Sequence, residues 1–493
     1  MLIPSLALLL ISAQKGPSPL HVSGNKVLDQ SGRPAKLRGV NICSLEWAAE
    51  GEHVLQSVSV AIDQWHSNII RLPLSQDRWF GKTADSPQGG AKYRALVKQV
   101  VAEIQKRSAY VILDLHWSDC GEWGKNIGQH ELPDKHSIEF WKSCAAEYAN
   151  NPAVIFDLYN EPYGAPWPLW HSGGSVTENI QGKPVTYQAA GLQSLLDAVR
   201  STGAKNLIHA GGLGYSSQLD FPENDLLKDR TGNGVVYVSH FYPGWENVPS
   251  WEARIERAAK KLPLLVEEFG DDAASAPMDT PAHRIGQVLA VLRKDNFNWT
   301  AWCMHPAARP CLILDWNYRP TPEFGALVKT ALAGGEVAIP PRRTHAPDFT
   351  VYEGKLTDPW QNWSSAKVDL SSPVEGQKSA HSIGVVLGPN QQFQLGTVPF
   401  DGLAYRGISL WIKSSPGKKA NLTLAAGIMD HAQPAVTLPE VGDDWTRVEI
   451  DFVALGISGK EDIKSFMFRN QNGSSSSTFF VDQVQILGQK PTS

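Results

Sequence analysis

Length, composition and charge limit the classes of protein to which this chain can belong. The chain has 493 residues, with 50 acidic and 45 basic side chains and a formal net charge of −5. It contains no dense Lys/Arg run, so nucleic acid and anionic membranes are not expected as partners. The length predicts one large and one medium domain, and we expect a monomer.

The first residues form a short apolar segment, Met1–Ala13, that ends in small side chains. This pattern is typical of a secretory signal peptide, although the usual basic start is missing. We therefore expect residues 1–19 to be a signal peptide and leader, and the protein to be secreted. No later apolar run reaches the ~20 residues that are needed to span a bilayer.

Between residues 20 and 335, apolar runs alternate with segments of helical period. Helical stripes such as Leu96–Ile104 separate several of these runs. The predicted strands are Leu37–Ile42, Asn68–Leu72, Tyr110–Leu115, Val154–Tyr159, Asn206–His209, Val235–Ser239, Leu264–Glu267 and Asn298–Trp302. Eight strands alternating with helices predict an α/β fold, a (β/α)₈ TIM barrel with its active site at the carboxyl ends of the strands. An open doubly wound sheet is the alternative, but no glycine-rich phosphate loop follows the first strand.

Two of the predicted strands end in carboxylates. Val154–Tyr159 leads into Asn160-Glu161-Pro162, and Leu264–Val266 leads into Glu267-Glu268-Phe269. Buried parallel strands emerge from the core at such points, so both carboxylates are expected at one edge of the barrel. Two carboxyl groups at that edge can cleave a glycosidic bond, one as acid/base and the other as nucleophile or base. The sequence therefore predicts a polysaccharide hydrolase.

The character of the sequence changes after the predicted barrel. Residues 336–347 are predicted to form a Pro-rich linker, and residues 348–490 contain short alternating runs separated by Gly, Pro, Ser and Asn. In Arg447–Phe452, for example, apolar and charged side chains alternate strictly. This is the pattern of a half-buried antiparallel strand, and several such runs predict an all-β jelly-roll sandwich.

The five cysteines form no CxxC pair, so a zinc knuckle is not expected. Cys303 and Cys311 are spaced so that a disulfide could close the loop between them, and Cys43 and Cys120 follow predicted strands and could meet. Cys144 lies on a helix and is expected to be a buried thiol. The alternative is that all five cysteines are reduced.

Other catalytic patterns are incomplete. The segment His130–His136 resembles a zinc-protease helix, but its histidines are six residues apart and Pro133 would break the helix. No Gly-x-Ser-x-Gly elbow is present, which disfavours a serine esterase. We therefore expect no metal and no organic cofactor.

Several motifs in order along residues 20–335 resemble glycoside hydrolase family 5, the retaining cellulase and β-mannanase family of (β/α)₈ barrels. The fifth predicted strand carries no such motif. The matching motifs are Leu37–Asn41, Ile70–Pro73, Leu113–Trp117, Asn160–Pro162, His240–Tyr242, Glu268–Gly270 and Trp302.

The resemblance implies that Glu161 is the acid/base and Glu268 the nucleophile of a retaining mechanism. A retaining pair must lie ~5–5.5 Å apart, against ~6.5–9.5 Å for inversion. The Glu-Phe-Gly pattern favours Glu268 over the adjacent Glu267, whose side chain should point the other way, towards helices or into the barrel.

The resemblance also implies six supporting residues. Asn160 would bind the sugar 2-hydroxyl group, and the others would hold the nucleophile (Arg71 and Tyr242), line the cleft (His116 and His240) and form a sugar platform (Trp302). A nearby guanidinium and a phenol favour the charged form of a nucleophile, whereas burial and a neighbouring charge keep an acid protonated.

The C-terminal residues resemble the sandwiches appended to polysaccharide-degrading enzymes, and we expect a carbohydrate-binding-like domain. Trp360, Trp363 and Phe393 are candidate sugar contacts. The alternative is a module that only packs on the barrel, with these three side chains in its core.

The predicted function is therefore a retaining endo-β-1,4-glucanase that hydrolyses a polysaccharide. A β-mannanase is the alternative within the same family, because both activities share the catalytic set. A non-catalytic glycan-binding protein on an inactive barrel is the alternative from another class, and it is disfavoured because both Glu161 and Glu268 are present.

Overall fold

The computed structural model describes residues 16–149, 151–272, 277–429, 431–471 and 476–490. The predicted signal peptide core, Met1–Ala13, lies outside these residues. The chain divides into two compact units. The first comprises Met1–Tyr242, Pro249–Gly270 and Val288–Val337, and the second comprises Pro243–Val248, Asp271–Gln287 and Ala338–Ser493.

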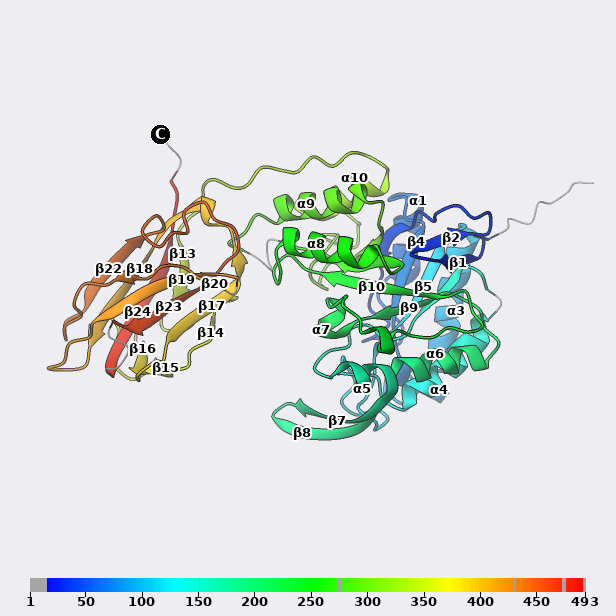
Figure 1. Ribbon diagram of the computed structural model, residues 1–493, viewed down its shortest axis with the longest axis horizontal. Helices are drawn as coiled ribbons and strands as arrows, with labels where there is room; N and C mark the ends of the chain where they lie inside the picture. Colours follow the sequence, from blue (N-terminus) through cyan, green and yellow to red (C-terminus); the bar gives the residue numbers. More distant parts are fainter. Residues whose placement is uncertain (1–15, 150, 273–276, 430, 472–475, 491–493) are drawn as a thin grey trace, which may run out of the picture. The chain divides into compact units, whose positions relative to one another are not determined.

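The first unit is built on a closed barrel of eight parallel strands (Figure 1). Around the barrel the order is β10-β11-β12-β3-β4-β5-β6-β9. All eight predicted strands are present, and the predicted TIM barrel is confirmed. The strands are β3 (Arg38–Asn41), β4 (Ile69–Ser75), β5 (Tyr110–Trp117), β6 (Val154–Asp157), β9 (Ile208–Gly211), β10 (Val235–Phe241), β11 (Leu264–Phe269) and β12 (Asn298–Ala301).

Helices connect the barrel strands, and their apolar faces pack inwards. In α3 the buried side chains Val97, Val100, Val101 and Ile104 form the predicted stripe. Burying one such side chain contributes roughly 1.5–3 kcal/mol. The α-helices are α1 (Val54–Asp63), α2 (Gln76–Trp79), α3 (Ala91–Lys106), α4 (His136–Tyr148), α5 (Trp167–Ser172), α6 (Leu192–Ser201), α7 (Leu213–Ser216), α8 (Val248–Ala259), α9 (Pro281–Lys294) and α10 (Gly325–Leu332).

A small hairpin closes the amino end of the barrel. Its strands, β1 (Leu20–Ser23) and β2 (Lys26–Asp29), are drawn in blue in Figure 1. Leu20 and Val27 from this hairpin pack in one buried cluster with Ile112, Ile155 and Val236 from the barrel strands. The amino end of the barrel is thereby sealed with apolar side chains, which leaves the carboxyl end for polar groups.

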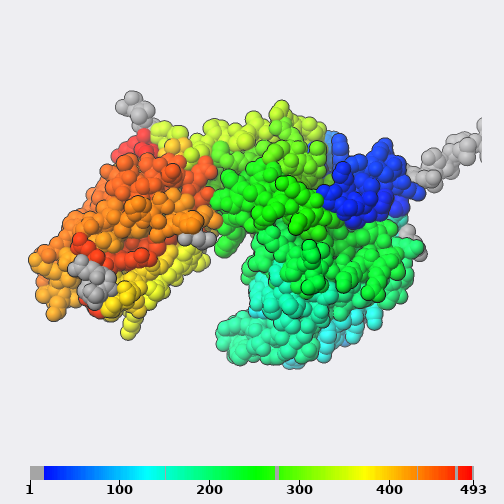
Figure 2. Space-filling view, in the orientation of Figure 1, coloured from blue at the N-terminus to red at the C-terminus, as the bar shows by residue number. Residues whose placement is uncertain are grey.

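A second hairpin interrupts the alternation between β6 and α6. Its strands, β7 (Gly173–Ile180) and β8 (Lys183–Ala190), pair antiparallel along their whole length. The hairpin extends from the barrel unit, at the bottom of the view in Figures 1 and 2. Its base is held to the loop after β5, because Tyr187 donates a hydrogen bond to the carbonyl of Leu132 (2.9 Å).

The C-terminal part of the second unit is a sandwich of two antiparallel sheets, as predicted. One sheet has the order β15-β16-β24-β18-β22 with β13 paired to β24, and the other has the order β14-β17-β23-β19-β20 with β21 paired to β19. The strands are β13 (Phe349–Tyr352), β14 (Gln361–Asn362), β15 (Lys367–Ser372), β16 (Ser382–Leu387), β17 (Phe393–Phe400), β18 (Tyr405–Ser414), β19 (Leu422–Ile428), β20 (His431–Ala432), β21 (Val436–Thr437), β22 (Thr446–Asp451), β23 (Ile463–Asn470) and β24 (Ser477–Gly488).

The sandwich core takes in one residue from the loop after β11. In β22 the alternation is as predicted, with Val448 and Ile450 buried and Glu449 exposed. Met278 is buried in the same cluster of apolar side chains as the strands of the sandwich. In the same unit, Arg284 forms ion pairs with Asp279 (2.5 Å) and Asp462 (3.1 Å).

The predicted disulfides are wrong. Cys43, Cys120, Cys144 and Cys303 are buried thiols, so neither Cys303 nor Cys43 is bonded to its predicted partner. Cys43 instead lies beside Cys303, with their sulfur atoms 3.2 Å apart. The reason is the closure of the barrel, which makes β12 and β3 neighbours, whereas Cys120 lies beyond the end of β5. The alternative of reduced cysteines therefore holds for these four residues.

Among the described residues, no helix combines the length and apolar character that crossing a bilayer requires.

Candidate active site

Polar and aromatic side chains gather at the carboxyl end of the barrel. Arg71 lies at the centre of this group and is completely buried. Two of its nitrogens donate hydrogen bonds to residues that sequence analysis predicted for the site. Nη1 donates to Glu268 Oε1, and Nη2 donates to Asn160 Oδ1 (2.8 Å). Arg71, from the second barrel strand, thus connects the carboxyl ends of the fourth and the seventh.

Arg71 is surrounded by four carboxyl groups. Besides Glu268, its nitrogens lie 3.0 Å from Asp114, 2.9 Å from Asp157 and 3.7 Å from Glu267. One buried positive charge cannot neutralise four negative ones, and burial itself penalises each carboxylate. Some of these carboxyl groups must therefore carry protons near neutral pH.

The pKa values follow this charge balance. Burial raises the pKa of Asp114 to about 7 and that of Glu267 to about 8, although the charge of Arg71 works in the opposite direction. Burial, with the charges of Glu267 and Asp114, also raises the pKa of Asp157. Burial alone would lower the pKa of Arg71, but the surrounding carboxylates raise it. The guanidinium therefore stays charged.

A register shift explains how the adjacent Glu267 and Glu268 both reach this centre. Along the β10–β11 pairing, Ser239 lies opposite Val266 and His240 opposite Glu268, so Glu267 has no partner in the register. A bulge of this kind interrupts the alternation of side chains along a strand. Glu267 points into the barrel, where it hydrogen-bonds to His209 Nδ1 (2.7 Å).

Glu268 is held at both carboxylate oxygens. Arg71 donates to Oε1, and the hydroxyl of Tyr242 donates to Oε2 at 2.6 Å. Both hydrogen bonds fix the orientation of the carboxylate. These are the two residues from which sequence analysis expected this contact.

Glu161 lies opposite, in a different environment. Its Oε1 hydrogen-bonds to His240 Nδ1 (2.9 Å), and the same ring nitrogen lies 3.5 Å from Glu268 Oε2. One carboxylate oxygen of each glutamate and this nitrogen all lie within 4.8 Å of one another. Burial raises the pKa of Glu161 to about 7 and lowers that of His240 to about 4. His240 is therefore neutral at pH 7.

The remaining predicted residues flank this pair. His116 hydrogen-bonds to Asp114 Oδ2 (2.6 Å), and its ring stacks on Trp302 with centroids 5.4 Å apart. Trp302 retains 9% of its surface exposed. Asn160 accepts from Arg71, and its Nδ2 donates to Gln129 Oε1 (3.0 Å). The structure therefore brings all eight predicted site residues into one connected group.

Sequence analysis missed several members of this group. Asp157 and His209 contact Arg71 and Glu267, and Asn41 accepts a hydrogen bond from Arg71 Nη1 (3.1 Å). Each of these three is a single polar residue within an apolar run, which is a usable signal. Gln129 lies in a long loop and carried no such signal.

The comparisons with known proteins agree with this geometry. The family model described as Cellulase (glycosyl hydrolase family 5) matches residues 28–308. The chain belongs to glycosyl hydrolase family 5. It is therefore a glycoside hydrolase, as its sequence predicted.

Relatives of this chain are cellulases and endoglucanases. It is 27% identical to Cellulase CelDZ1 of Thermoanaerobacterium sp over 299 residues, which cover 58% of this chain and 70% of the relative. It is 26% identical to an endoglucanase of Paenibacillus polymyxa over 366 residues, covering 64% of this chain and 89% of the relative.

Solved structures share the fold. The β-glucanase SdGluc5_26A from Saccharophagus degradans, solved in complex with cellotetraose, aligns with a TM-score of 0.52 and 21% identity. The alignment covers 67% of this chain and 98% of that one.

Replacing the central guanidinium should destabilise the barrel strongly. Arg71→Met keeps most of the side-chain volume but leaves four carboxyl groups without a cation, and removing one partner of a buried ion pair costs about 3–5 kcal/mol. We expect a loss of this size in the free energy of unfolding, measured with urea. The control is Arg257→Met, whose exposed pair with Asp220 should contribute at most about 1 kcal/mol. Equal effects of the two substitutions would contradict the central role of Arg71.

Proposed function

We propose that this family 5 enzyme is a retaining endo-β-1,4-glucanase in which Glu268 is the nucleophile and Glu161 the acid/base. The observation that carries the proposal is the spacing of the pair, with one oxygen of each glutamate inside a group of atoms no more than 4.8 Å apart. A retaining mechanism requires carboxyl groups about 5–5.5 Å apart, whereas inversion needs about 6.5–9.5 Å to admit a water molecule.

The surroundings of the two carboxyl groups support different roles for them. Arg71 and Tyr242 donate to Glu268 and favour the charge that a nucleophile needs. Glu161 contacts neither of these donors in the described residues, and burial raises its pKa to about 7. A carboxyl group with such a pKa can protonate the leaving oxygen and then, as a carboxylate, activate water in the second step.

The glucan preference of the proposal comes from the relatives, which are named cellulases and endoglucanases. A β-mannanase remains the same-class alternative, since it would use the same catalytic group. Product analysis on cellulose, mannan, xylan and mixed-linkage glucan distinguishes the two. Release of oligosaccharides from mannan alone would contradict the glucanase proposal, and absence of hydrolysis on all four would favour the non-catalytic alternative.

Azide rescue should separate the roles of the two glutamates. Glu161→Ala should retain the first step on an aryl glycoside with a good leaving group, such as a dinitrophenolate, because that group needs little protonation. It should then stall, and azide should speed it and yield the β-glycosyl azide. Glu268→Ala should be inactive without azide and should yield the α-azide with it. NMR of the products gives the anomeric configuration.

The control for this experiment is Glu139→Ala, which removes an exposed carboxylate from α4 and should leave the rate unchanged. An α-azide from Glu161→Ala, or an inverted sugar from the native enzyme, would exclude the assigned roles.

The pH dependence of kcat/KM should report the proton on Glu161. Burial raises its pKa to about 7, so the protonated form that donates to the leaving group is lost as the pH rises through that value. On a glucan, we expect kcat/KM to fall about tenfold per pH unit well above pH 7. On a dinitrophenyl glycoside the fall should be much weaker, because the leaving group needs no proton. An equally steep fall on both substrates would argue against Glu161 as the acid.

We further propose that the sandwich binds glycan chains on the sheet that contains β17, β19 and β23. A hollow of about 350 Å³ lies on this sheet, lined by Trp363, Gln392, Gln394 and Arg469 among others. Trp363 is 37% exposed, so part of its indole is available to stack on a sugar ring, and the amides and guanidinium can hydrogen-bond hydroxyl groups. Trp360 and Phe393 are buried in the core and are not sugar contacts.

Removing the exposed indole should weaken binding to an insoluble polymer. We expect Trp363→Ala to lower the fraction of protein that sediments with insoluble cellulose while leaving hydrolysis of a soluble glucan unchanged. The matched control is Trp445→Ala, which removes a partly exposed indole next to β22 in the other sheet. Unchanged sedimentation of Trp363→Ala would favour the packing role instead. Single substitutions are preferable to cutting the chain at the linker, because Met278, which lies before the linker, belongs to the sandwich core.

We also propose that the protein is exported as a monomer, with a barrel domain at residues 20–335, a linker at 336–347 and a sandwich domain at 348–490. The apolar segment Met1–Ala13 supports export, and a single chain supplies every residue of the active site. Detection of the protein only inside its cells would contradict export, and detection of a dimer by sedimentation would contradict the monomeric state.

A further inference from the structure

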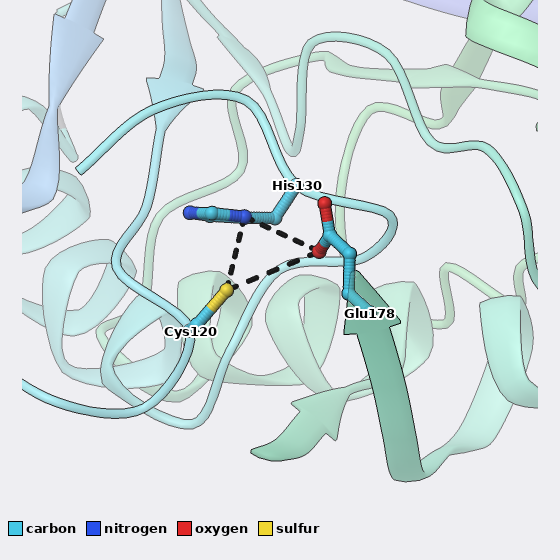
Figure 3. A group of neighbouring side chains, drawn as sticks. All are labelled: Cys120, His130 and Glu178. Atoms are coloured by element: carbon cyan, nitrogen blue, oxygen red, sulfur yellow. Dashed lines mark hydrogen bonds and ion pairs between the residues drawn. The ribbon is translucent and has the colours of Figure 1, made fainter. Parts of the chain in front are cut away.

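A second cluster of chemically reactive side chains lies outside the catalytic group. It consists of Cys120, His130 and Glu178 (Figure 3). His130 Nδ1 lies 2.9 Å from Cys120 Sγ and 3.2 Å from Glu178 Oε2, and the sulfur lies 3.9 Å from that oxygen. All three residues are buried, so they are available as a preformed group within the fold.

Two separate parts of the chain supply these residues. Cys120 and His130 belong to the long loop between β5 and α4, and Glu178 belongs to β7 in the projecting hairpin. Cys120 has a φ of 59°, in the left-handed region that a residue other than glycine rarely adopts. Such a strained conformation is often found at functional sites.

The hydrogen bonds around the cluster direct lone pairs towards its centre. His130 Nε2 donates to the carbonyl of Asn126 (2.5 Å), which leaves Nδ1 of the neutral ring as an acceptor. Tyr163 donates to Glu178 Oε1 (2.7 Å), so Oε2 is the oxygen that faces the histidine. A nitrogen lone pair and a carboxylate oxygen 3.2 Å apart repel each other unless a proton or a cation lies between them.

We propose that Cys120, His130 and Glu178 bind one zinc ion, with a water molecule as the fourth ligand. Zinc prefers thiolate, imidazole and carboxylate donors at about 2.3, 2.0–2.1 and 2.0–2.2 Å. In a tetrahedral site these bond lengths place the donor atoms about 3.4–3.6 Å apart, and each observed separation lies within about 0.7 Å of that range. The bond from His130 to Asn126 is the outer contact that zinc-binding histidines usually make.

Zinc would also resolve the charge state of the cysteine. Zinc bonds to cysteine as the thiolate, so the thiol proton of Cys120 leaves when the ion binds and the affinity for zinc should rise with pH. Sequence analysis compared His130 only with a zinc-protease helix that would include His136, and rejected that motif, so it did not expect this site. The structure separates them, since α4 begins only at His136.

A bound ion would fix the position of the loop that contacts Asn160 and Glu161. Gln129, the neighbour of His130, donates to the carbonyl of Glu161 (2.8 Å) and accepts from Asn160 (3.0 Å). Tyr159 adds a second link, because its hydroxyl donates to the carbonyl of His130 (3.1 Å). The zinc ligands are thus positioning residues, which act on catalysis through Gln129 and contact no substrate.

Metal content and thermal unfolding test the site without relying on activity. The full-length protein, reduced and stripped with a chelator, should take up about one Zn²⁺ per chain, and its Tm should rise by about 5 °C in excess zinc. Co²⁺ in place of zinc should show a thiolate-to-cobalt charge-transfer band. Cys120→Ser should lose that band and most of the Tm shift, whereas Cys144→Ala, which alters a buried thiol in α4, should keep both.

His136→Asn controls for a neighbouring cluster, because Asp119, Asp134 and His136 also lie close together. This variant should bind zinc like the native protein. The proposal would be overturned if the native protein showed no cobalt–thiolate band, bound less than about 0.2 zinc per chain, or lost its zinc through His136→Asn and not through Cys120→Ser.

Discussion

The buried guanidinium of Arg71 is the constraint on which the rest of the active site depends. A positive charge without access to solvent is costly unless carboxylates surround it, and four of them do so here. These carboxyl groups come from three other strands of the barrel, so the charge balance also fixes how the strand ends face one another. The same residues are therefore needed both for the stability of the barrel and for the geometry of the site.

This balance has a further effect on the catalytic pair. Burial raises the pKa values of Asp114, Asp157 and Glu267, which reduces the negative charge around Arg71 near neutral pH. Glu161 lies beyond this group and is linked to it through neutral His240. The two glutamates thus occupy different environments, since Glu268 accepts hydrogen bonds from Arg71 and Tyr242 whereas Glu161 lies beside His240.

Sequence analysis predicted the barrel, the sandwich and the eight residues that the structure brings together at the carboxyl end of the barrel, because strand periodicity and strand-end motifs are local signals. It did not predict relations that depend on closure of the barrel or on long loops. Cys43 meets Cys303 because the last strand pairs with the first. The position of Glu267 required a bulge, which a strict alternation of side chains does not anticipate. Trp360 and Phe393 were indistinguishable from Trp363 in sequence, since an aromatic residue in a sandwich can face the core or the solvent.

The loop after β11 begins two residues beyond Glu268, yet its later part belongs to the second compact unit. Met278 lies in the core of the sandwich, and Arg284 is paired with Asp462 from the loop that leads into β23. A module joined only by a linker can be exchanged for another with little effect on its neighbour. Here an exchange would leave Met278 exposed and Arg284 without one of its carboxylates, on a segment that starts at the catalytic strand. The second unit is therefore not a purely C-terminal segment of the sequence, because it includes residues that lie between β11 and β12.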